Sequence, residues 1–206
     1  KQIGENTSNS ICLLSLEWIH INIPQGENIM EMNLRETWTV VHGMVFGFIF
    51  LLGFSGALYM IYSMKPALLT AEGLTKTVNA AKIYVWGLAL SVWAAVFTGA
   101  WVVYPWYRAV PPDGTTDLST FPKFLLLASE NTAKWHEFGM EWKEHVAFLA
   151  PIAATVVAYV VSYYGPQLAK KVGERRAVMI FFIFAFVATA IAGMFGAFIT
   201  KAAAVR

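Results

Sequence analysis

Residues 178–200, VMIFFIFAFVATAIAGMFGAFIT, contain no ionisable side chain and decide the fold class of this chain. A helix needs about 20 mostly apolar residues to cross a hydrocarbon core of about 30 Å. This stretch meets that requirement, and the runs 40–62, 83–104 and 146–163 have a similar character. Because lipid offers no hydrogen-bond partner, each run must satisfy its own backbone as a helix. The sequence therefore predicts an all-α, integral membrane four-helix bundle.

The composition agrees with this fold class. Of the 206 residues, 57% are hydrophobic and only 14% are charged, whereas soluble domains carry about 25% charged residues. A membrane β-barrel would show segments of about ten residues with alternating polarity, and the four runs are continuous instead. The formal net charge of +2 is too small to indicate binding of nucleic acid. The expected surroundings are therefore membrane lipid and other membrane proteins.

The chain divides into two predicted parts. Residues 1–36 mix polar and apolar side chains without a run long enough to span, which predicts an extracytoplasmic N-terminal segment on the membrane surface or against a partner. Residues 37–206 form the predicted four-helix transmembrane domain, with a proline-containing outer loop at 105–130. The sequence lacks the basic start, short apolar run and small-residue cleavage site of a signal peptide, so no cleaved leader is expected within it.

Basic residues are concentrated in two short turns of the predicted bundle. Only Glu72 and Glu174 oppose them there. The positive-inside rule counts Lys and Arg in short loops, so we expect both turns in the cytoplasm and both termini outside, as in a bacterial-type inner membrane. The basic residues of these turns and of the adjoining start of the second run are Lys65, Lys76, Lys82, Lys170, Lys171, Arg175 and Arg176.

Two histidines lie at matching depths on different predicted helices. His42 lies two residues inside the first run, and His145 lies immediately before the third run. With a rise of about 1.5 Å per residue, both lie just below the outer interface. Two imidazoles at one depth are what a six-coordinate haem iron needs, and no CxxCH motif is present for covalent attachment. We therefore predict His42 and His145 as ligands of a noncovalent haem b.

Other residues complete this predicted haem site. Gly53 lies on the same face of the first helix as His42, where a small residue admits a flat macrocycle or a neighbouring helix. The basic residues Arg108, Lys123 and Arg35 lie on the same outer side. They would pair with the haem propionates, which are costly charges at a boundary of low dielectric.

His136 is the alternative iron ligand. It lies nine residues before His145, which places it on the opposite helix face and about 13 Å higher. We therefore expect its side chain to be exposed to solvent. No role is predicted for His20.

Acidic residues on the same helix suggest a second kind of site. Glu137, Glu141 and His145 follow one another at four-residue spacing, and Glu144 is adjacent, so one face would offer carboxylate and imidazole to a metal ion. A di-iron bundle, however, uses Glu-x-x-His pairs with further carboxylates from other helices, and the predicted transmembrane domain, residues 37–206, has no such pair. The alternative is a solvated helix start, where negative charge is also favoured by the helix dipole.

With its helical histidines, the chain resembles small membrane b-type cytochromes, in which such residues hold haem within a four-helix bundle. The resemblance covers residues 40–200 at the level of topology. It implies a non-catalytic electron-transfer subunit of an oxidoreductase complex, which passes electrons between a quinone or membrane partner and an extracytoplasmic redox protein.

Two other functions remain open from the sequence. One is a cofactor-free accessory subunit of a multi-subunit respiratory or electron-transfer complex, suited to docking by its long outer loop. The other is a transporter, although transporters usually place polar sites near the bilayer midplane in broken helices. The predicted helices carry no charge at that depth.

Overall fold

The computed structural model describes residues 32–203, so nearly all of the predicted N-terminal segment, with His20, lies outside the described residues. The described part contains helices and no strand. Four helical stretches are long and apolar enough to cross a membrane: Leu34–Ser63, Ala71–Tyr107, Glu130–Ala169 and Val172–Ala202. This confirms the predicted all-α four-helix fold of a membrane protein.

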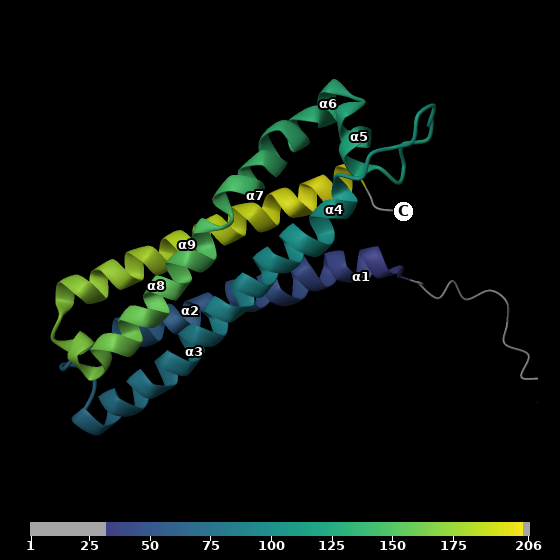
Figure 1. Ribbon diagram of the computed structural model, residues 1–206. Coiled ribbons are helices and arrows are strands. Elements are labelled where there is room, and N and C mark those ends of the chain that lie inside the picture. Colours follow the sequence, from purple (N-terminus) through teal and green to yellow (C-terminus); the bar gives the residue numbers. More distant parts are fainter. Residues whose placement is uncertain (1–31, 204–206) are drawn as a thin grey trace, which may run out of the picture. The chain divides into compact units, whose positions relative to one another are not determined.

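Three of the four stretches are built from consecutive helical segments of different type, and the fourth is one continuous α-helix (Figure 1). In chain order, the first stretch contains α1 (Leu34–Val40), the π-helical turn η1 (Val41–Gly47) and α2 (Phe48–Ser63), and the second contains α3 (Ala71–Thr98), the π-helical turn η2 (Gly99–Val103) and α4 (Tyr104–Tyr107). The third stretch contains α6 (Glu130–Lys134), the π-helical turn η3 (Trp135–Met140), α7 (Glu141–Val146), α8 (Leu149–Tyr164) and the 3₁₀ turn η4 (Gly165–Ala169). The fourth stretch is α9 (Val172–Ala202). The short helix α5 (Pro122–Leu127) lies in the long loop between the second and third stretches.

Consecutive stretches run in opposite directions (Figure 1). The start of α1, the long loop with α5 and the end of α9 therefore lie at one end of the bundle, which we call the loop end. The two short turns lie at the other end, which we call the turn end: residues 64–70, and residues 165–171, which include η4 at the end of the third stretch. Within the bundle, α8 packs against α3 and α9, and α2 packs against the same two helices.

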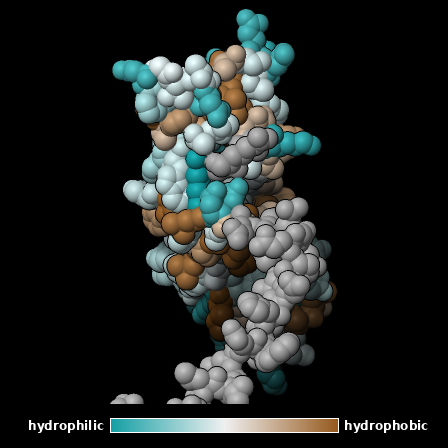
Figure 2. Space-filling view, turned by 90° about the vertical axis from the view of Figure 1, so that its right-hand side faces the viewer, coloured by the Kyte–Doolittle hydropathy of each residue, from teal (hydrophilic) through white to brown (hydrophobic). Residues whose placement is uncertain are grey.

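The core combines small residues with a few large apolar ones. Alanines such as Ala57, Ala154 and Ala185 are fully buried and allow the helices to approach closely, as is typical of helix packing in lipid. Large apolar side chains also cover the outside of the helices, including Ile83 and Leu52, and Figure 2 shows such side chains reaching the surface of one face. This apolar exterior suits a lipid environment.

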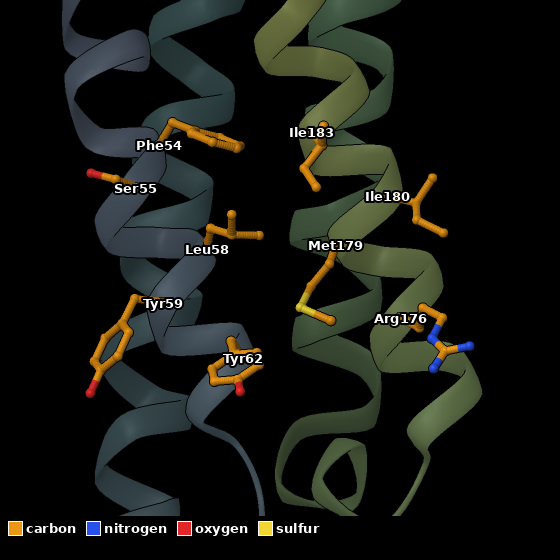
Figure 3. A pocket seen from close by; sticks show the side chains of 9 residues that line it. All are labelled: Phe54, Ser55, Leu58, Tyr59, Tyr62, Arg176, Met179, Ile180 and Ile183. Atoms are coloured by element: carbon orange, nitrogen blue, oxygen red, sulfur yellow. The ribbon is translucent and has the colours of Figure 1, made fainter.

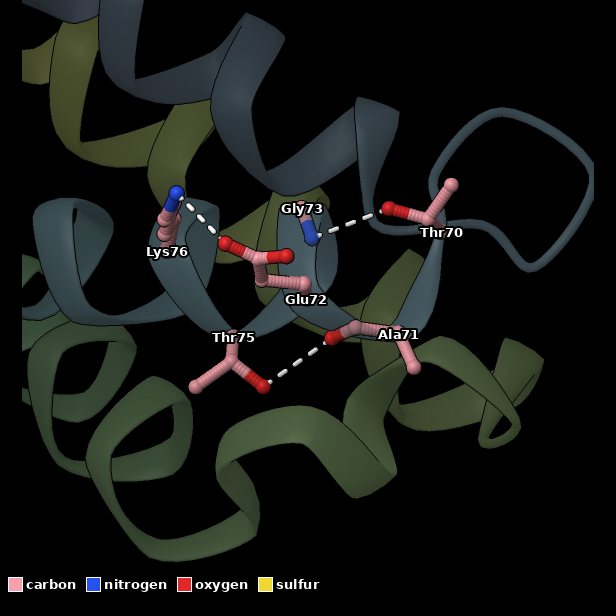
Figure 4. Close-up of polar contacts among 6 residues, drawn as sticks. All are labelled: Thr70, Ala71, Glu72, Gly73, Thr75 and Lys76. Atoms are coloured by element: carbon pink, nitrogen blue, oxygen red, sulfur yellow. Dashed lines mark hydrogen bonds and ion pairs between the residues drawn. The ribbon is translucent and has the colours of Figure 1, made fainter.

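Local contacts explain where the helices begin. Asn33 and Glu36 form a reciprocal capping box at the start of α1. At the start of α3, the hydroxyl of Thr70 accepts a hydrogen bond of 3.1 Å from the backbone N–H of Gly73 (Figure 4). Each cap satisfies a backbone donor that the first turn of a helix leaves free. In the next turn of α3, Lys76 pairs with Glu72 at 2.7 Å.

Arg175 joins the two connections at the turn end. Its side chain is only 6% exposed, and Nη1 donates hydrogen bonds to the carbonyl oxygens of Met64 at 2.7 Å, Leu168 at 3.2 Å and Ala169 at 2.8 Å. These carbonyl groups follow α2 or belong to η4, where the helical hydrogen-bond ladders end. Arg175, which was counted among the basic residues of the turns, thus also has a structural role.

We predict that Arg175→Met lowers the stability of the bundle by about 3 kcal/mol, because it leaves buried carbonyl groups without a donor. Lys170→Met is the matched control, since Lys170 is an exposed basic residue of the same turn. Thermal unfolding in one detergent, followed by circular dichroism, measures both variants. Equal unfolding midpoints for the two variants would show that the Arg175 contacts contribute nothing.

Candidate functional site

Ionisable and hydroxyl side chains gather at the loop end of the bundle. They come from three of the spanning stretches and include groups on η1, α4, η3 and α7. The residues that we consider together as the loop-end cluster are Arg35, His42, Tyr104, Tyr107, Arg108, His136, Lys143 and Glu144.

All three π-helical turns of the described chain lie in this part of the bundle. Such turns widen the helix by one residue, are rare, and occur frequently at functional sites. Each of them contains glycine, at Gly43 and Gly47 in η1, at Gly99 in η2 and at Gly139 in η3. The helix backbone is therefore modified at the level where the polar side chains gather.

His42 is half-buried and directed at the second stretch. Its Nδ1 lies 2.6 Å from the carbonyl oxygen of Ala95, in the last turn of α3. Because a carbonyl oxygen can only accept, Nδ1 must donate, and the neutral ring then carries its lone pair on Nε2. A hydrogen bond of this kind at one ring nitrogen orients a histidine whose other nitrogen binds a metal. Within the described residues, Nε2 of His42 forms no hydrogen bond.

The His42 ring lies directly on Gly99. A Cβ atom added to Gly99 would stand 2.6 Å from Cε1 of His42 and 3.1 Å from Nδ1. The first of these distances is shorter than non-bonded carbon atoms tolerate. Glycine at this position therefore allows the imidazole to reach the Ala95 carbonyl.

His136 is buried, which makes the expectation of a solvent-exposed side chain wrong. It is only 7% exposed, and its Nδ1 lies 2.8 Å from the hydroxyl of Tyr107. The physical reason is the π-helical turn η3, which contains His136 and packs against α9 and α5. A turn of this type breaks the α-helical period on which the exposure was predicted.

His145 faces away from the bundle. Its side chain is 75% exposed, and Nδ1 donates a hydrogen bond of 2.7 Å to the carbonyl of Glu141 on its own helix. No described hydrogen bond, ion pair or ring contact joins His145 to His42. The structure does not bring these two histidines together, and their joint ligation of one iron stays a prediction.

The predicted residue Gly53 serves helix packing. It is buried beneath the side chains of Leu88 and Tyr84 from α3. The sequence left open whether a macrocycle or a neighbouring helix lies against Gly53, and in the structure the neighbouring helix α3 does.

The three predicted propionate partners have different surroundings. Arg108 donates a hydrogen bond of 2.7 Å to the hydroxyl of Tyr104, and Lys123 lies 5.8 Å from the ring centroid of Phe124. Arg35 donates from Nη1 to the carbonyl of Thr120 at 3.1 Å, while its Nη2 is buried and has no hydrogen-bond partner within the described residues. Arg35 therefore retains a free donor for an anion.

Sequence reasoning missed the inward direction of Lys143 and Glu144. A Cβ atom added to Gly196 of α9 would stand 3.0 Å from Nζ of Lys143, so this ammonium group lies against the fourth stretch. Within residues 32–203 it forms no hydrogen bond or ion pair. Oε1 of Glu144 is also buried without a hydrogen-bond partner there. Glu137 and Glu141 are exposed, as a solvated helix start requires, whereas Glu144 is half-buried and departs from that interpretation. The only signal for its burial was its place next to the third apolar run.

These polar groups influence one another across the helices. Glu144 and Arg108 both act electrostatically on Tyr107 and His136, and Lys143 acts on His42. Buried polar atoms are normally hydrogen-bonded, so those of Arg35 and Glu144 call for a ligand, an ion or water as partner. A metal held by protein alone has no support, since residues 32–203 contain no group of three His, Cys, Asp or Glu that could hold an ion.

No known protein-family model, curated protein or solved structure matches this chain.

We predict that Gly99→Ala destabilises the bundle, by about 1–3 kcal/mol, because the added methyl group must displace the His42 ring. Gly87→Ala, also in the second stretch, is the control, since nothing lies within 4 Å of a Cβ atom there. Thermal unfolding midpoints of the two variants measure the effect. An unchanged midpoint for Gly99→Ala would contradict the close contact between His42 and Gly99.

Proposed function

We propose that this chain is an electron-transfer subunit of a membrane oxidoreductase complex and binds haem b at its loop end through His42. The observation that carries the proposal is the hydrogen bond from Nδ1 of His42 to the Ala95 carbonyl at 2.6 Å. It fixes the ring orientation and leaves Nε2 as the atom that binds iron.

Charges in the loop-end cluster support a noncovalent haem. Haem carries two propionates, and Arg35 offers a buried Nη2 without a partner within the described chain. Lys143 adds an ammonium group that forms no ion pair there and acts electrostatically on His42. Pairing with a carboxylate would satisfy both cations. The bound group would supply one-electron chemistry, while the protein would orient it and set its polarity.

In this proposal the second axial ligand comes from the third stretch. His145 has a free Nε2 but an exposed side chain, and a haem shared with His42 would require that side chain to turn inward. His136 already faces inward, with its Nδ1 held by Tyr107. Variants of each histidine distinguish the two assignments.

The proposal extends to orientation and partners. In this proposal the turn end is cytoplasmic and the loop end, with both termini, lies outside a bacterial-type inner membrane, which the basic residues of the short turns support. Electrons would then pass between a quinone or another membrane subunit and an extracytoplasmic redox protein that docks at the loop end.

A cofactor-free accessory subunit is the second candidate function. It is favoured by the close contact of the His42 ring with Gly99 and by the exposure of His145 on the outside of the bundle. In that case the His42 hydrogen bond would fasten the first stretch to the second, and the loop end would serve as a docking surface.

We predict that the purified protein contains haem b and that His42→Ala reduces its haem content at least tenfold, because the variant removes an axial ligand. Haem is measured by extraction as the pyridine complex and normalised to protein. His136→Ala and His145→Ala are compared in parallel, and the variant that also loses haem identifies the second ligand. Gly87→Ala controls for handling of the membrane fraction.

Circular dichroism must show that His42→Ala remains helical. Full haem content in this variant would exclude His42 as a ligand. A folded wild-type protein that contains no haem would favour the accessory subunit.

A further inference from the structure

A groove runs along the outside of the bundle between α2 and α9, and none of its lining residues belongs to the loop-end cluster. Its volume is about 470 Å³. Phe54 and Leu58 from α2 and Met179 from α9 line its apolar part, and Tyr62 and Arg176 lie toward the turn end (Figure 3). The groove thus has one apolar end and one end with a cation.

The apolar part of the groove suits a hydrocarbon chain. From Arg176 to Ile183, its lining on α9 extends over about 10 Å at the rise of an α-helix. Ile180 and Ile183 are exposed at its edge, so the groove is open toward the side where lipid chains lie. Burial of an acyl chain would be favourable through close packing with these side chains.

The polar end suits an anion. Arg176 is exposed and forms no hydrogen bond or ion pair with any described residue. Lys65 follows Tyr62 by three residues, and its Nζ lies 3.3 Å from the centroid of the Tyr62 ring. Tyr62 is itself part of the groove lining. A guanidinium group binds phosphate oxygens in a bidentate manner. The lining of the groove thus includes one cation, Arg176, and a second, Lys65, lies on the ring of the lining residue Tyr62.

We propose that this groove binds an anionic phospholipid, with one acyl chain between α2 and α9 and its phosphate at Arg176. The charges favour this occupant over a quinone, because a neutral ring gains little from a guanidinium group. They also favour it over a zwitterionic lipid, whose ammonium group would meet Lys65 and Arg176 unfavourably. Basic pockets between helices near the cytoplasmic surface bind anionic headgroups in this way. The site does not depend on haem binding at the loop end.

The test compares lipid binding by the delipidated protein in detergent. Thermal unfolding midpoints are recorded with increasing phosphatidylglycerol or phosphatidylcholine, and native mass spectrometry counts the lipids that remain bound. The wild type is expected to gain stability from phosphatidylglycerol at lower concentrations than from phosphatidylcholine. Arg176→Gln is expected to weaken the phosphatidylglycerol effect about tenfold, which corresponds to about 1.4 kcal/mol.

Lys76→Gln is the matched control, because it removes a basic residue at the same end that already pairs with Glu72 (Figure 4). It should respond to phosphatidylglycerol as the wild type does. Equal responses to the two lipids, a preference for an added quinone, or an unchanged response of Arg176→Gln would each overturn the proposal. Arg176 is on the surface, and circular dichroism without lipid verifies that its variant is folded.

Discussion

Every backbone amide of the four stretches must find its hydrogen-bond partner inside the protein, because lipid provides none. Long helices meet this constraint over most of the bundle, and additional contacts meet it where the helices end. At the turn end, Arg175 donates to three carbonyl groups of the two connections. At the loop end, the helical pattern changes to π-helical turns, and side chains take part in satisfying the backbone.

The contact between His42 and Ala95 illustrates this link between backbone and site. Ala95 lies in the last turn of α3, immediately before the π-helical turn η2. Its carbonyl is available to Nδ1 of His42, and Gly99 in η2 leaves room for the ring. The Ala95 carbonyl also accepts from the backbone N–H of Gly99 and from the hydroxyl of Thr98, so Gly99 contributes the space for the His42 ring rather than a freed acceptor. This arrangement supports a ligand role, and it would also fasten two helices in a protein without cofactor.

The four spans could be predicted from the sequence because apolar runs of sufficient length have one stable structure in lipid. The helices extend beyond the predicted runs: the third begins at Glu130, whereas its apolar run begins at residue 146. Hydropathy registers only the part of a helix that suits hydrocarbon. The polar extension belongs to the same helix and contains much of the loop-end cluster.

The candidate site was predictable only in part. Its depth and the choice of His42 as a candidate followed from an ionisable residue inside an apolar run. The burial of His136 and the inward position of Glu144 could not be predicted, because η3 changes the helical phase and no sequence pattern indicated a π-helical turn there. Lys143 was missed for a related reason, since its charge suggested solvent while its ammonium group lies against Gly196 of α9. Likewise, Arg175 looked like one more basic residue of a cytoplasmic turn.

The proposed function requires a redox group bound to His42 at the loop end. A reduced-minus-oxidised absorption spectrum of the purified wild-type protein tests it most directly. With haem bound to His42, the spectrum is expected to show the sharp α-band of a b-type haem, at an intensity of about one haem per chain. A folded, helical protein whose spectrum shows no haem band would contradict it.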